Sequence, residues 1–91
     1  MWDLEYSGQF KKDLKKMSKR GADIDLLRKA LDYLVADGQV PSSFRPHILS
    51  GNWSGVWECH ISPDWLLLYD LSESVKLVRL IRTGTHSDVF K

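Results

Sequence analysis

The chain has 91 residues, a formal net charge of +1 and a single cysteine, Cys59, so it fits one domain, residues 1–91, without an internal disulfide. Its longest apolar run, Trp65 to Tyr69, is far shorter than the roughly 20 residues that span a membrane, and its first residues lack the pattern of a signal peptide. We therefore expect a cytoplasmic protein with no membrane partner.

The first half of the chain predicts one short strand and two amphipathic helices. Apolar and acidic side chains alternate over residues 2–6, which is typical of a strand. Ser7 is a suitable N-cap for a first helix, and Asp23 or Asp25 for a second helix that ends at Gly38. The apolar stripes of these helices are Phe10, Leu14 and Met17 on the first, and Ile24, Leu27, Leu31 and Leu34 on the second.

The second half predicts a loop and an antiparallel meander. Residues 38–52 are rich in proline, serine and glycine and are predicted as a loop. Three strands follow over residues 56–61, 65–71 and 75–82, and the pattern assigns no structure to the tail beyond them. The fold class expected is α+β: a two-layer domain with a short N-terminal strand and two helices on one face of a sheet that contains the meander.

Meander geometry brings several polar residues to one end of that sheet. Neighbouring strands run in opposite directions, so His60, Asp64 and Arg82 are expected at the same end. His86 follows four residues after Arg82, and His47 lies close enough in the loop to return there. Each residue alone also suits a surface or turn position, so the prediction of a site depends on their convergence.

This set of residues suits RNA cleavage by attack of the ribose 2′-hydroxyl on the neighbouring phosphate. The reaction needs a base, an acid and a cation for the phosphate charge, and histidine and arginine serve these roles near neutral pH. An aromatic side chain can also stack an RNA base, and we expect Trp65 and Phe90 to do so. Trp2 and Trp57 are expected in the core instead.

A basic segment adds a candidate surface for phosphates. Residues 11–29 carry eight basic and three acidic side chains. Such a strip can bind RNA or ribosomal phosphates, or it can be an ordinary solvated helix face. The candidate RNA-binding lysines are Lys11, Lys12, Lys15, Lys16 and Lys19.

The chain resembles the YafQ branch of the RelE-like toxins, the toxin halves of bacterial type II toxin–antitoxin pairs. The likeness covers nearly the whole chain and rests on four segments: EYSGQFKKD at 5–13, HILSGNWSG at 47–55, ECHISPDWLLLY at 58–69 and RTGTHSDVF at 82–90. One departure is Trp57, because the position two residues before Cys59 is commonly arginine in that family.

The resemblance implies a RelE-like fold, cleavage of messenger RNA on the translating ribosome, and a cognate antitoxin that blocks the site. It implies acid–base chemistry without a metal or other cofactor, in which the arginine holds the scissile phosphate. The matching positions in this chain are His47, His60, Asp64, Trp65, Arg82, His86 and Phe90.

Two other functions are open to this sequence. The same fold in the ParE branch inhibits DNA gyrase by binding it, which requires no convergent histidines. A zinc site could draw on His47, Cys59, His60 and His86, but adjacent residues of a strand point to opposite faces, so Cys59 and His60 are poorly placed to share an ion.

Overall fold

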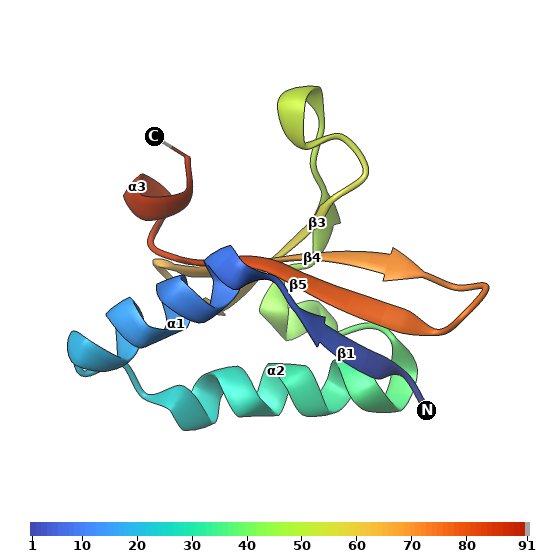
Figure 1. The fold of residues 1–91 in the computed structure, drawn as a ribbon, viewed down its shortest axis with the longest axis horizontal. Helices are drawn as coiled ribbons and strands as arrows, with labels where there is room; N and C mark the ends of the chain where they lie inside the picture. Colours follow the sequence, from blue (N-terminus) through green and yellow to red (C-terminus); the bar gives the residue numbers. More distant parts are fainter. Residues whose placement is uncertain (91) are drawn as a thin grey trace.

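The computed structural model describes residues 1–90 and consists of a mixed five-stranded sheet with two long helices against one face (Figure 1). The strand order is β1-β5-β4-β3-β2, in which β1 pairs with β5 in parallel and the other pairs are antiparallel. This arrangement confirms the predicted α+β class. The strands are β1 (Asp3–Tyr6), β2 (His47–Ile48), β3 (Trp57–Ser62), β4 (Trp65–Ser72) and β5 (Leu77–Gly84).

The long helices begin and end where their capping residues predict. The Ser7 side chain accepts a hydrogen bond from the Phe10 backbone N–H, and Asp23 caps the second helix. Gly38 ends that helix in the left-handed conformation, and the Trp2 indole occupies the space that a side chain there would need. The helical elements are α1 (Gly8–Lys19), α2 (Ile24–Asp37), η1 (Ser42–Phe44), η2 (Gly51–Trp53) and α3 (His86–Val89).

The two faces of the sheet carry different cores. The face covered by α1 and α2 holds the main core, which includes the fully buried side chains of Phe10, Leu34, Cys59, Leu67 and Leu80. The opposite face holds a smaller apolar cluster, over which α3 and the β2–η2 segment stand (Figure 1). Within residues 1–90, no helix is long and apolar enough to cross a membrane. The smaller cluster contains Leu49, Trp53, Val56, Leu66, Leu68, Ile81, Val89 and Phe90.

Two segments are more ordered than their sequence patterns indicate. The predicted loop 38–52 contains the two-residue strand β2, which is paired with β3 through His47–Glu58 and Ile48–Trp57. Both residues of β2 are exposed, so the segment has no apolar alternation to reveal it. The unassigned tail forms the single turn of α3, where the side chains of Thr85 and Asp88 make a reciprocal capping box.

A β-bulge in β5 sets the direction of its last residues. The pairing of β4 with β5 shifts between Leu68–Arg82 and Tyr69–Leu80, which leaves Ile81 as the extra residue. Leu68 also pairs with Glu58 of β3, so Glu58, Leu68 and Arg82 form one row across the sheet. The bulge therefore places Arg82 in register with Glu58 on the face away from the long helices.

Candidate active site

Strand β3 directs its polar residues away from the helices. Cys59 is fully buried in the main core and Ile61 is also buried there, so Glu58 and His60 lie on the opposite face. Cys59 and His60 thus point to opposite faces of the sheet, as strand alternation predicts. It also rules out the zinc set considered above, because the Cys59 thiol is covered by the helices.

Glu58 is the centre of a histidine pair. Its side chain is buried, and its Oε1 lies 3.0 Å from Nε2 of His47 and 3.7 Å from Nε2 of His60. The two imidazole rings are 6.5 Å apart, centre to centre. Glu58 was not among the site residues predicted from the sequence, although the strand face that it shares with His60 was a signal that could have indicated it.

Nδ1 of each ring in this pair has unusual hydrogen-bonding surroundings. Nδ1 of His47 faces the Arg45 carbonyl at 3.3 Å while Nε2 faces the Glu58 carboxylate, so both contacts are hydrogen bonds only in the doubly protonated ring. Nδ1 of His60 is buried without a hydrogen-bond partner in the described part of the chain. A buried polar atom of this kind is uncommon in folded proteins.

His86 is the first residue of α3, at the other side of the same face. Its backbone N–H donates to Oδ1 of Asp64 at 3.3 Å, so the β3–β4 turn is tied to the start of α3. The exposed imidazole packs against the ring of Phe90, with 4.9 Å between ring centres. Asp64 and His86 therefore lie together, as the meander geometry predicts.

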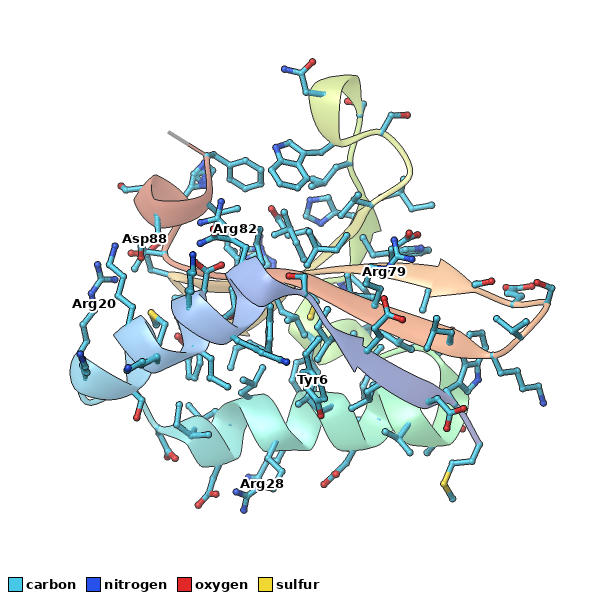
Figure 2. The ribbon with its side chains drawn as sticks, in the orientation of Figure 1. Tyr6, Arg20, Arg28, Arg79, Arg82 and Asp88 are labelled. Atoms are coloured by element: carbon cyan, nitrogen blue, oxygen red, sulfur yellow. The ribbon has the colours of Figure 1, made fainter. Side chains whose placement is uncertain are left out.

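Asp88 fixes α3 against α1. Its carboxylate pairs with Arg20 at 2.6 Å and with Lys16 at 3.3 Å, and Figure 2 shows Arg20 and Asp88 pointing toward one another at this junction. The hydrogen bond from Arg20 holds the pKa of Asp88 well below its ordinary value, with further help from Thr85 and Lys16. Lys16 and Arg20 of the basic segment thus form ion pairs with Asp88 at the surface.

Trp53 of η2 contacts Phe90, with ring centres 6.1 Å apart and an edge-to-face geometry. This contact links the β2–η2 segment to α3 above the smaller apolar cluster. Phe90 is half-buried by it, and Trp53, which the sequence analysis did not select, is a second aromatic side chain at this place.

The proposed stacking role of Trp65 is wrong. Trp65 is only 3% exposed and lies in the main core, where its indole N–H donates to the Thr83 hydroxyl at 2.8 Å. It points to the helix side because it alternates in phase with Leu67 and Tyr69 along β4. Trp57 packs on the ring of Tyr69 on the same side, as the core assignment of that residue predicts.

Arg82 reaches the site face with one edge of its guanidinium already bound. Nε donates to Oδ2 of Asp13 at 2.7 Å and Nη2 donates to Oδ1 at 3.2 Å. Hydrogen bonding to Asp13 raises the pKa of Arg82 above its ordinary value. A contact from Nη2 to the Asp88 carbonyl at 3.4 Å places the group beside α3, where it is labelled in Figure 2.

The five predicted catalytic residues thus occupy one face but form two groups. His47 and His60 are joined through Glu58, whereas Asp64 and His86 are joined by a hydrogen bond near Arg82. Among the cavities of the described residues, a cavity of about 300 Å³ is lined by His60 without His86 or Arg82. That cavity therefore adjoins the histidine pair alone.

A family model described as bacterial toxin of type II toxin–antitoxin system, YafQ, matches residues 2–91. The chain belongs to the YafQ family of toxins. The mRNA interferase toxin YafQ of Escherichia coli K12 is 40% identical over 89 residues, which are 97% of this chain and 95% of that protein. The resemblance inferred from the sequence is confirmed.

Solved YafQ structures share the architecture of this chain. The crystal structure of YafQ from E. coli BL21(DE3) superposes with a TM-score of 0.91 at 38% identity and covers 100% of both chains. The toxin in the E. coli DinJ–YafQ toxin–antitoxin complex superposes with a TM-score of 0.88 at 40% identity, covering 99% of this chain and 98% of that one. The RelE-like fold expected from the sequence is therefore the fold of this YafQ-family chain.

Proposed function

We propose that this YafQ-family toxin is an endoribonuclease that cleaves messenger RNA on the translating ribosome. The observation that carries the proposal is the placement of three histidines, Asp64 and Arg82 on one open face of the sheet. The E. coli relatives named mRNA interferase support it. An open face also suits a substrate that is presented by a larger particle.

The proposed reaction is attack of the 2′-hydroxyl on the adjacent phosphorus. A base removes the 2′ proton, the new P–O2′ bond forms, the P–O5′ bond breaks, and an acid protonates the leaving oxygen. The products are a 2′,3′-cyclic phosphate and a 5′-hydroxyl. Side chains alone supply these proton transfers, so the proposed mechanism uses no metal or cofactor.

The residues take their proposed roles from their surroundings. His86 carries out one proton transfer because its ring is exposed and, within residues 1–90, has no polar partner. His60 or Asp64 carries out the other, and both lie beside strand ends of the same face. His47 adds positive charge when doubly protonated, and Arg82 binds the scissile phosphate.

We also propose that a cognate antitoxin neutralises the toxin by covering this face. The E. coli YafQ relative is known in complex with the antitoxin DinJ. The edge-to-face pair of Trp53 and Phe90 lies between α3 and η2 and offers an aromatic surface for a partner chain. Cleavage by the purified toxin should stop when the antitoxin is added in equimolar amount.

The test is chemical mapping of RNA ends with purified protein, ribosomes and a defined message. We expect 5′-hydroxyl and cyclic-phosphate ends within the reading frame, cleavage that persists with a zinc-selective chelator at constant Mg²⁺, and little cleavage of free RNA. His86→Ala should slow cleavage by about 10²-fold or more, the scale for removing a proton-transfer group. Ser87→Ala, on the same exposed turn, is the matched control.

Other outcomes would contradict the proposal. Ends that carry a 5′-phosphate and a 3′-hydroxyl would exclude 2′-hydroxyl attack. Equal rates for His86→Ala and Ser87→Ala would remove His86 from the chemistry. Growth arrest without any cut message, together with inhibition of DNA gyrase in vitro, would support the gyrase-binding alternative.

A further inference from the structure

Asp13 is a buried carboxylate on α1. It is 6% exposed, and all its contacts are donors. Oδ2 accepts from Arg82 Nε at 2.7 Å and from the Thr83 backbone N–H at 3.2 Å. Oδ1 accepts from Arg82 Nη2 at 3.2 Å and from the Gln9 amide at 2.9 Å. Four donors therefore fix this carboxylate in one orientation.

A backbone hydrogen bond adds to the ion pair between Asp13 and Arg82, because the Thr83 N–H donates to the same carboxylate. Beyond the end of β1, α1 borders β5: Ser7 donates to the Leu80 and Ile81 carbonyls, and Asp13 accepts from the Thr83 N–H. The carboxylate is thus held by the same strand that carries Arg82. A pair anchored to the backbone in this way restricts the guanidinium to a small range of positions.

The pairing uses only one edge of the guanidinium. Nε and one N–H of Nη2 are bound to Asp13, and the contact of Nη2 with the Asp88 carbonyl is long, at 3.4 Å. Within residues 1–90, Nη1 has no hydrogen-bond partner, so its two N–H groups remain for a ligand. An arginine bound at its Nε edge can still bind a phosphate through its terminal nitrogens.

We propose that Asp13 is a positioning residue that aims Arg82 at the scissile phosphate. Its carboxylate binds the edge formed by Nε and Nη2, which fixes the guanidinium plane before substrate binds. Nη1 then remains available to the phosphate. This role rests on the proposed function. The opposite possibility is that Asp13 competes with phosphate for Arg82 and restrains the enzyme, and the experiment below separates the two.

The first test replaces Asp13 with its neutral isostere. In ribosome-dependent cleavage, Asp13→Asn should lower kcat by about 10- to 100-fold with less than about threefold change in KM, because misaligned groups mainly affect the transition state. Asp32→Asn, the same change at an exposed position of α2, is the matched control. In an Arg82→Ala background, Asp13→Asn should lower kcat by less than about twofold, because the two residues act as one unit.

A second measurement uses the unmodified protein, in case Asp13→Asn fails to fold. The Nε–H of Arg82 should give a slowly exchanging signal in ¹⁵N spectra, and this signal should remain when an uncleavable 2′-deoxy dinucleoside phosphate is added, while the Nη signals shift. Loss of the Nε–H signal on addition would mean that phosphate displaces Asp13, and faster cleavage by Asp13→Asn would identify a restraint. Either result overturns the positioning role.

The two proposals fail in different ways. If the wild-type protein cuts no message, the proposed function fails and the role of Asp13 falls with it. If the wild type cuts and Asp13→Asn cuts equally well, only the role of Asp13 is lost. An equal effect of Asp13→Asn with and without Arg82 would show that it contributes stability alone.

Discussion

At the scale of single residues, Glu58 has the most unusual surroundings on the site face. Its buried carboxylate is in reach of two imidazole rings that come from different strands. A carboxylate in this position can orient both imidazole rings without contacting the substrate, as in well-known proton-transfer triads. It therefore couples His47 to His60, and its removal should affect both.

We predict that Glu58→Gln lowers the cleavage rate but less than loss of a proton-transfer group, which costs about 10²-fold or more. Glutamine keeps the size of the side chain and removes the charge that holds the rings. The measurement is the single-turnover rate over a range of pH, with Glu73→Gln in the exposed β4–β5 turn as control. A rate equal to that of the control would show that the buried carboxylate is not needed.

At the scale of elements, α3 is a single turn of helix that carries His86, and it depends on three separate attachments. The capping box of Thr85 and Asp88 forms the turn, Asp64 holds its first backbone N–H, and Lys16 and Arg20 tie it to α1. A helix this short has little intrinsic stability. The position of α3, and with it the position of His86, therefore depends on these attachments.

We predict that Asp88→Asn lowers the free energy of unfolding near pH 7, and that this difference from the wild type becomes smaller as the pH falls from about 4 to about 2. The folded protein holds the pKa of Asp88 below the value of 3.8 for a free group, so this residue stabilises the fold above pH 4. The contribution is lost as the pH falls from about 4 toward the lower folded value. Urea unfolding of both proteins from pH 2 to 7 measures this, and parallel pH curves would contradict the assignment.

At the scale of the whole molecule, charge is distributed unevenly around the site. α1 carries five exposed lysines, and of these Lys16 is paired with Asp88. Within residues 1–90 the other four form no ion pair, and they lie on the helix that contacts Arg82, where they can meet phosphates of RNA or ribosome. The lysines are Lys11, Lys12, Lys15, Lys16 and Lys19.

We predict that the triple variant Lys11→Gln, Lys12→Gln, Lys15→Gln binds ribosomes with a weaker dependence on salt. Each lost phosphate contact should reduce the slope of log K against log salt by about 0.7–0.9, so the loss of three contacts changes it by roughly 2 to 3. Lys76→Gln, in the β4–β5 turn far from the site, should leave the slope unchanged. Equal slopes for all variants would show an ordinary solvated helix face.

The sequence could predict most of the fold because its strongest local signals agree with the structure. Apolar runs separated by turn residues predicted β3, β4 and β5, and apolar stripes with caps at Ser7, Asp23 and Gly38 predicted α1 and α2. The sequence patterns did not predict β2 and α3, because a two-residue strand depends on tertiary pairing and a one-turn helix depends on its side-chain caps.

The site was predictable to the extent that strand direction determines it. The convergence of His60, Asp64 and Arg82 follows from the meander. The burial of Trp65 and the pairing of Arg82 with Asp13 do not, because they depend on the phase of β4 at its first residue and on where α1 meets β5.

Both outer strands of the sheet are short: β1 has four residues, two of them acidic, and β2 has two. Exposed strand edges are the places where sheets of neighbouring molecules join into aggregates. A toxin released from its antitoxin has to remain dispersed in a crowded cell until it meets a target. These two short edge strands give this chain few backbone groups through which one copy could extend the sheet of another.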